Sequence, residues 1–224
     1  MTPELGPPLG PALAPALVLA ALGLLPLAFM TLTAFVKIST VLHIARSALG
    51  VPEVPSSAVV FALSTALTLV VMAPVGERIS ARALPLAEGA AAGRPADVAA
   101  LARAVREPLG EFLRANASPA ELDRFLALRR RAHPTAAAEV TAEDLSVVVP
   151  AFLVTELVEA FLLGFALLLP FLAVDLVVAT LLAALGLPGL PAASVALPVK
   201  LALFLAADGW GRLAETLVGG YQAP

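Results

Sequence analysis

The side chains of this sequence that are best suited to chemistry are a few charged residues inside long apolar stretches. Residues 145–187 are overwhelmingly apolar and carry only three charges, Glu156, Glu159 and Asp175. Glu156 and Glu159 are three positions apart, so a helix would place both carboxylates on one face. A carboxylate in apolar surroundings is costly unless it faces protein, water or a partner. The pattern therefore predicts charges at a packed interface or along a pore.

A basic residue in the last apolar segment is placed to neutralise one of these acids. Lys200 interrupts the apolar residues 195–207, and Asp208 follows that run. We expect Lys200 to pair with one of the three acids named above, within one chain or between copies. The alternative is that all these charges lie near helix ends and are solvated.

Residues 31–49 predict a helix that is polar along one half. At about 3.6 residues per turn, one half is apolar and the other carries Thr33, Lys37, Ser39, Thr40, His43, Arg46 and Ser47. Such a helix lies at a membrane interface, lines a wet cavity or packs its polar half on other subunits. The alternative is a lipid-facing helix whose Lys37 and Arg46 extend to lipid headgroups.

The sequence contains no motif that would supply a catalytic or cofactor site. A phosphate-binding Gly-rich loop, a His-Glu-x-x-His pair and a Gly-x-Ser-x-Gly turn are all missing. There are no cysteines and only two histidines, His43 and His133, so a metal site is not expected. The net charge of −3 is too small to suggest nucleic acid. We therefore expect a protein that is not an enzyme, with no cofactor and no nucleic-acid partner.

The composition indicates a membrane protein. Hydrophobic residues make up 60% of the chain, charged residues 14%, and the mean hydropathy is +0.95. Soluble domains average about 45–50% apolar and about 25% charged residues. Residues 145–187 alone are long enough for roughly two membrane crossings. Glu4 is the only charge before residue 37, so the basic start of a secretory signal is missing and we expect an uncleaved membrane segment.

These patterns predict an all-α fold of membrane-associated helical hairpins in three parts. Residues 1–76 would form N-terminal hydrophobic helices, residues 77–144 a small polar helical insert, and residues 145–224 C-terminal hydrophobic helices. The insert holds ten of the 14 basic residues, all of them Arg, and ten of the 17 acids, so its net charge is near zero. The positive-inside rule would place the insert in the cytoplasm, but the insert is longer than the loops for which that rule holds.

Serine and proline residues predict where several helices begin and end. Ser56 or Ser57 should cap a helix over residues 58–75, and Pro74 should close it. Pro170 should break or kink the long apolar segment. In the insert, the sequence Ser-Pro-Ala-Glu at 118–121 combines an N-cap, Pro at the first helical position and a capping-box Glu, which predicts a helix to about residue 131.

Four blocks in the apolar segments form a pattern typical of one family. They are Phe35-Val36-Lys37-Ile38 leading to Arg46-Ser47-Ala48-Leu49-Gly50; Leu67 to Val75; Pro150-Ala151-Phe152 with Glu156-Leu157, Ala160-Phe161, Gly164-Phe165, Pro170-Phe171-Leu172 and Asp175 to Ala179; and Leu197 to Leu201 with Asp208-Gly209-Trp210. In order and spacing, over roughly residues 30–75 and 145–218, the chain resembles the inner-membrane export-apparatus protein of type III secretion. This is the SctR family of injectisomes, called FliP in flagella.

The resemblance implies a core subunit of an export gate through which unfolded proteins are secreted. Family members form a homo-oligomer, a pentamer, together with other small type III export-apparatus membrane proteins, and are in contact with membrane lipid. The resemblance also implies a multi-pass protein of the bacterial inner membrane, with the assembled complex partly on the periplasmic side and the insert in the periplasm. The charges expected at subunit interfaces or in the pore are Lys37, Arg46, Glu156, Glu159, Asp175, Lys200 and Asp208.

The turn before the last segment departs from the family pattern. Family members usually carry a run of methionines there, which forms a flexible gasket in the pore. The matching turn in this chain holds no Met, and its candidate constriction residues are Leu187, Pro188, Gly189 and Leu190. Either another subunit makes the seal or it is made differently in this chain. We expect Leu187 and Leu190 to take over the constriction, because leucine is also apolar.

Three functional alternatives follow from these observations. One is a purely structural membrane scaffold, for which substitutions of pore-lining residues would not affect transport. Within the family, Lys37 and the missing cleavable signal sequence favour an injectisome member over a flagellar one. Outside it, Glu156, Glu159, Asp175 and Lys200 could form the relay of a small-solute or ion transporter. That transporter would act as an autonomous monomer or dimer, whereas an export-gate subunit requires co-assembly.

Overall fold

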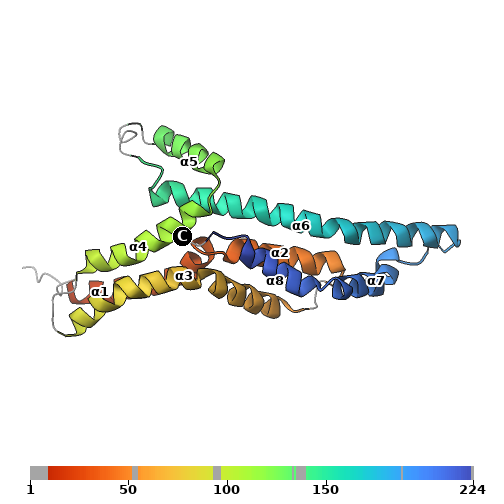
Figure 1. The fold of residues 1–224 in the computed structure, drawn as a ribbon, viewed down its shortest axis with the longest axis horizontal. Coiled ribbons are helices and arrows are strands. Elements are labelled where there is room, and N and C mark those ends of the chain that lie inside the picture. The colour runs from red at the N-terminus through yellow and green to blue at the C-terminus, as the bar shows by residue number, and fades with distance from the viewer. Residues whose placement is uncertain are drawn as a thin grey trace, which may run out of the picture.

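A computed structural model describes the protein over residues 10–51, 55–92, 97–132, 134, 140–187 and 189–222. Within these ranges the regular structure consists of eight α-helices and contains no strand. The molecule is elongated, and its longest helix runs along much of its length (Figure 1). The expected all-α fold class is confirmed. Residues 1–9, which include Glu4, lie outside the described residues.

A short helix, α2 (Phe35–Leu49), lies at the centre of the packing. The first helix, α1 (Gly10–Thr31), leads into it, and α3 (Ser57–Ala91) follows it. The long helix α6 (Leu145–Ala184) packs along α2, and α3 packs on another side of it. Gly50 ends α2 because it adopts φ 81°, the left-handed conformation that glycine reaches without a steric penalty.

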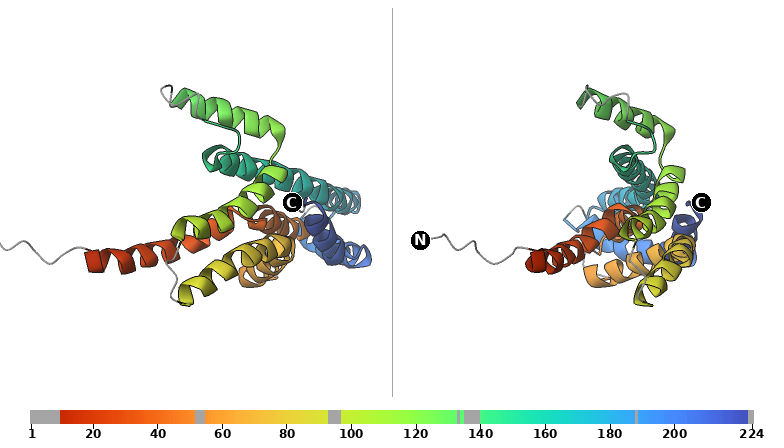
Figure 2. Two further views of the ribbon diagram at one scale, coloured as in Figure 1. Left: turned by 60° about the vertical axis from the view of Figure 1, so that its left-hand side comes forward. Right: turned by 90° about the vertical axis from the view of Figure 1, so that its left-hand side faces the viewer.

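The polar insert folds as two helices that depart from the hydrophobic body. Helix α4 (Val98–Ala115) pairs with the second half of α3, and α5 (Pro119–Ala132) packs on α6. Figure 2 shows α1 and the α3–α4 hairpin extending from one end of the body. Two exposed ion pairs align the hairpin: Arg78–Glu111 at 3.0 Å and Arg82–Glu107 at 2.8 Å.

The chain ends in two short helices at the other end of the body. Helix α7 (Ala192–Ala206) packs against α6, and α8 (Gly209–Gly219) runs back beside α3 (Figure 1). The main hydrophobic core joins α2, α3, α4, α6 and α8 and includes Ile38, Leu42, Val75, Phe112, Phe152 and Leu217. A second, smaller core at the far end consists of Ala48, Leu49, Phe171 and Phe204.

The boundary predicted at Pro74 is wrong, and a helix also continues through Pro170. Ser56 does cap α3, where its side chain accepts from the backbone N–H of Val59. The helix then continues through Pro74 and past residue 77, where the predicted insert begins. Pro170, predicted to break or kink the long apolar segment, lies inside α6, so of these two alternatives a break is excluded. Neighbouring helices and local adjustments compensate for the single hydrogen bond that each proline removes, as in membrane helices.

The helix predicted after Ser118 is present, but its capping box is not formed. Helix α5 begins at Pro119 as expected. However, the backbone N–H of Ser118 donates to the Thr155 hydroxyl of α6 at 2.9 Å. Glu121, the predicted capping residue, instead pairs with Arg124. A tertiary contact has thus replaced the local one, and it ties the insert to α6.

Sharp bends separate α1 from α2 and α7 from α8. The end of α1 and the whole of α2 meet at 66°, where the Thr33 hydroxyl donates to the Phe29 carbonyl and accepts from the Phe35 N–H. The last two helices meet at 57°, at Asp208, which has φ 50°. By length and composition α3 and α6 are each able to cross a membrane, and each bent pair passes the same test as a unit.

Candidate functional site

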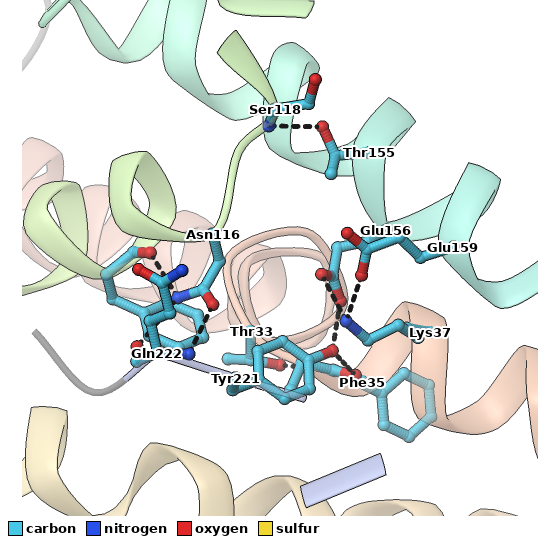
Figure 3. Close-up of polar contacts among 12 residues, drawn as sticks. Thr33, Phe35, Lys37, Asn116, Ser118, Thr155, Glu156, Glu159, Tyr221 and Gln222 are labelled. Carbon is cyan, nitrogen blue, oxygen red and sulfur yellow. Dashed lines mark hydrogen bonds and ion pairs between the residues drawn. The ribbon is translucent and has the colours of Figure 1, made fainter. Parts of the chain in front are cut away.

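The first candidate site is a buried ion-pair cluster between α2 and α6. The Lys37 Nζ atom lies 3.1 Å from Glu156 Oε1 and 2.7 Å from Glu159 Oε2. The side chains of Lys37 and Glu156 are 3% and 0% exposed, whereas that of Glu159 is 48% exposed. Burial on this scale is tolerable because each charge meets an opposite charge. Figure 3 shows the Lys37 amine between the two carboxylates.

Tyr221, which follows α8, completes this cluster. Its hydroxyl donates to Glu156 Oε2, and the Lys37 amine lies 3.9 Å from the centre of its ring (Figure 3). Burial, and after it the charge of Glu156, raises the pKa of the Tyr221 phenol above its ordinary value. The phenol therefore keeps its proton and acts as a donor. A charged-group hydrogen bond and a cation–π contact thus both depend on this ring.

Gln222, close to the C-terminus, is hydrogen-bonded to Asn116 of the insert beside this cluster. The Gln222 N–H donates to Asn116 Oδ1 at 2.9 Å, and Asn116 Nδ2 donates to the Gln222 carbonyl at 3.1 Å (Figure 3). A cavity of about 420 Å³ lies here, with Lys37, Glu156 and Glu159 on its wall. The cluster therefore connects the body, the insert and the end of the chain.

A second ion pair lies at the opposite end of α2. Lys200 Nζ is 2.5 Å from Asp175 Oδ2 and 3.4 Å from the Ala48 carbonyl oxygen. Lys200 is 5% exposed and Asp175 33% exposed. Of the three acids that the sequence offered to Lys200, the fold brings Asp175 to it within one chain. Lys37 and Ala48 are eleven residues apart, so the two clusters are separated by about 16 Å of helix.

The remaining predicted charges stand apart from both clusters. The Arg46 side chain donates to the Pro55 carbonyl at 3.2 Å and to the Ser57 hydroxyl at 3.1 Å, which closes the loop after α2. Asp208 is exposed at the bend before α8, and its side chain forms no hydrogen bond to the first turn of that helix. Neither side chain forms an ion pair or a hydrogen bond with a member of the two clusters within the part of the chain that the structure describes.

The predicted constriction residues lie in the exposed turn between α6 and α7. Gly186 adopts φ 71°, and the N–H groups of Gly186 and Leu187 bond back to α6, so the helix ends in a Schellman motif. Leu187 is 46% exposed and Leu190 49% exposed, and Gly189 is exposed as well. Pro188 lies outside the described residues. The turn projects beyond α2 at one tip of the molecule (Figure 1).

One face of α6 is apolar and uncovered along most of the helix. It is formed by large side chains that are between 47% and 68% exposed: Val158, Phe161, Leu162, Phe165, Leu169, Leu172 and Leu176. Exposed apolar surface of this extent indicates contact with lipid or with other subunits. No cluster of metal-binding side chains occurs in the part of the chain that the structure describes, and His133 lies outside that part.

Sequence reasoning placed Lys37 on the wrong side of its helix and missed Tyr221. Lys37 is buried with Ile38 and Val41, whereas His43 and Ser47 are exposed. Its angular position, close to that of Val41 and Ala48, could have indicated this. Nothing in the local sequence marks Tyr221, because its partner Glu156 is 65 positions away in the chain.

Comparison with known proteins identifies relatives over nearly the whole chain. The model of the FliP family matches residues 18–217. A probable translocation protein of Sinorhizobium fredii is 41% identical over 92% of this chain and 93% of its own length. A hypersensitivity response secretion protein of Ralstonia nicotianae is 40% identical over 90% of this chain and 94% of its own length. A flagellar biosynthetic protein of Caulobacter vibrioides is 37% identical over 92% of this chain and 74% of its own length.

Proposed function

Because this chain belongs to the FliP family, whose members are components of type III export apparatus, we propose that it is a core subunit of the export gate. With copies of itself and other small export-apparatus membrane proteins, it would form the channel through which unfolded proteins are secreted. A structural subunit of this kind performs no catalysis. The family implies a pentamer.

The observation that carries this proposal is the uncovered apolar face of α6. Phe161, Leu162 and Phe165 are each at least 60% exposed, although the helix also carries the charges that pair with Lys37 and Lys200. A helix that buries charges on one face and exposes aromatic and aliphatic side chains on the other is suited to a helical assembly. Neighbouring subunits, with lipid at the outer edge, would cover the exposed face.

Within the family we propose an injectisome role and a place in the bacterial inner membrane. The relatives named for translocation and for the hypersensitivity response support an injectisome over a flagellum. The bent pairs and the two long helices suit a multi-pass protein. The insert, residues 77–144, would face the periplasm, and the assembled complex would lie partly on that side of the bilayer.

No observation favours the alternative of a small-solute or ion transporter. Each of its three proposed relay acids is paired with a lysine inside the chain. The two pairs lie about 16 Å apart along α2, and the helix side that faces the core between them is apolar, with Val41 and Ala45. A proton or ion relay would need polar groups to bridge that distance.

The deciding experiment is native mass spectrometry of the detergent-extracted protein, alone and co-expressed with the small membrane proteins of its operon. We expect a ring of several copies whose mass increases when partner subunits bind. A stable monomer or dimer that does not bind these membrane proteins would contradict the proposed gate. Solute-uptake assays with Glu156, Glu159 and Asp175 variants would then be the next step.

We also propose that Leu187 and Leu190 form the pore constriction. The chain has no cysteine, so a Leu187→Cys or Leu190→Cys change creates a single reactive site. With a secreted substrate trapped in the channel, both cysteines should crosslink to it or be shielded from a thiol reagent. Leu84→Cys, a 57% exposed position on α3, is the control that should stay reactive. Unchanged labelling at 187 and 190 would disprove the constriction.

A further inference from the structure

Arg212 on α8 differs from the other basic residues outside the insert. Lys37 and Lys200 are in ion pairs, and Arg46 donates two hydrogen bonds. Arg212 is exposed and forms neither an ion pair nor a side-chain hydrogen bond within the part of the chain that the structure describes. A guanidinium beside membrane-capable helices is available for an anionic group outside the chain.

Arg212 stands at the edge of an apolar groove. The groove has a volume of about 300 Å³ and lies where α6, α7 and α8 meet. Its walls include Leu167 and Phe171 from α6, Leu203 and Phe204 from α7, and Leu213 from α8. Both α6 and the α7–α8 pair pass the length and composition test for a membrane span. Such a groove is suited to an acyl chain rather than to a polar ligand.

The exposed face of α8 beside the groove carries charges of both signs. Thr216 follows Arg212 by four positions and also lines the groove, so the two side chains share one face of α8. Glu215 follows Arg212 by three positions, which places its carboxylate on the same face of α8. Asp208 is the residue before α8, and its carboxylate lies against Gly211, the neighbour of Arg212 in the chain. All four side chains are exposed, and neither acid forms an ion pair within the described ranges.

We propose that this groove binds a phospholipid with a phosphoethanolamine headgroup. Its phosphate would accept hydrogen bonds from Arg212 and Thr216. Its primary ammonium would donate to Asp208 or Glu215, and one acyl chain would fill the groove. Two carboxylates disfavour a lipid that carries only negative charge. A choline headgroup, whose nitrogen has no N–H, cannot donate to them. A site with both signs of charge therefore selects a headgroup with both.

The experiment measures lipid retention, so it is independent of whether the chain belongs to an export gate. The detergent-extracted protein, with any co-assembled partners, is stripped of lipid by detergent exchange. Phosphatidylethanolamine, phosphatidylglycerol or phosphatidylcholine with identical acyl chains is then added, and native mass spectrometry counts the bound lipids. We expect preferential retention of phosphatidylethanolamine.

Two pairs of matched variants test the two halves of the site. Arg212→Gln should weaken phosphatidylethanolamine binding about tenfold, as expected for the loss of one charge-assisted hydrogen bond. Arg131→Gln, at an exposed position of α5, should not change binding. Leu203→Trp should fill the groove and reduce binding, whereas Leu205→Trp should not, because Leu205 is on the same helix but does not line the groove. Arg212→Lys keeps the charge and tests the site if Arg212→Gln fails to assemble.

Equal retention of the three lipids, unaffected by Arg212→Gln and Leu203→Trp, would overturn the proposal. A protein occupant would overturn it as well. In that case Thr216→Cys would crosslink to a second copy or to a partner subunit, and no lipid would remain with the purified complex.

Discussion

At the scale of single residues, a small number of partners neutralises the buried charges. Lys37 has two carboxylates within 3.1 Å and a tyrosine ring beneath it, and Glu156 accepts from Lys37 and from Tyr221. Lys200 has one carboxylate and one carbonyl oxygen. Because desolvated charges depend strongly on such partners, removal of one partner should cost far more than its exposed area suggests.

The two glutamates of the first cluster should contribute unequally to stability. Glu156→Ala leaves a buried ammonium without its fully buried partner, and we expect it to lower the free energy of unfolding by about 3–5 kcal/mol. Glu159→Ala should cost less than about 1 kcal/mol, because Glu159 is half exposed to solvent. Denaturation in mixed detergent micelles would compare the two variants. Equal losses of unfolding free energy in the two variants would mean that the buried Glu156 contributes no more to stability than the half-exposed Glu159.

The Tyr221 hydroxyl should have a separate effect from the Tyr221 ring. Tyr221→Phe keeps the stacking on Phe112 and the contact with Lys37 but removes the donor to Glu156. We expect a loss of about 1.5–3 kcal/mol, the range for hydrogen bonds to charged groups. Tyr221→Leu should lose more, because it also removes the aromatic contacts. If the Tyr221→Phe variant were as stable as the unchanged protein, the hydrogen bond from Tyr221 to Glu156 would contribute nothing to the free energy of unfolding.

At the scale of elements, close packing of α2 on α6 positions the ion pairs of Lys37. Gly164 of α6 is buried directly against Ile44 of α2, and a Cβ added at residue 164 would overlap the Ile44 side chain. Glycine is therefore needed there to let the two helices approach, as small residues do in membrane helix pairs. The distance between the helices in turn determines whether Lys37 reaches Glu156.

A substitution at Gly164 should separate the two helices. We expect Gly164→Ala to destabilise the protein by about 1–3 kcal/mol through overpacking, and Ile44→Ala in the same chain to restore part of that loss. Gly76→Ala in α3 is the matched control. An added Cβ there meets nothing within 4 Å, so helix propensity should make that change neutral or stabilising. A double-mutant cycle with no coupling between residues 44 and 164 would contradict this packing argument.

At the scale of the whole molecule, the chain exposes more apolar surface than one soluble subunit tolerates. This surface extends over α6 and the first half of α3, where Phe61, Leu69 and Val70 are at least half exposed. The insert, by contrast, pairs its charges at the surface, as Arg78–Glu111 and Arg82–Glu107 do. The hydrophobic body thus carries the extended apolar surface that requires lipid or other subunits.

A charge placed on the uncovered face of α6 should block assembly without unfolding the subunit. We expect Leu162→Asp to prevent co-assembly, because a carboxylate in an apolar helix environment costs about 2.5–3.5 kcal/mol. Leu128→Asp, at a similarly exposed position of α5, should leave assembly unchanged. Native mass spectrometry would read out the size of the complex. Normal assembly of the Leu162→Asp variant would show that this face lies outside the subunit contacts.

The sequence alone determined the fold class, the apolar segments, the charges inside them and, through spaced blocks, the family. Local rules suffice for these features because hydropathy, helix periodicity and cap residues such as Ser56 act over a few positions. They also placed the start of α5 at Pro119 correctly. They were wrong at Pro74, because local rules for soluble helices omit the neighbouring helices that support a proline.

Only the tertiary structure decided which charges meet and which residues support them. Lys37 pairs with residues 119 and 122 positions away, and Lys200 selects Asp175 from three possible acids. Tyr221 and Gln222 contribute only because the end of the chain returns to α2, α6 and the insert. The pairs of Lys37 with α6 depend on how closely Gly164 lets α2 approach that helix. Such long-range distances follow from packing, which no local pattern in the sequence encodes.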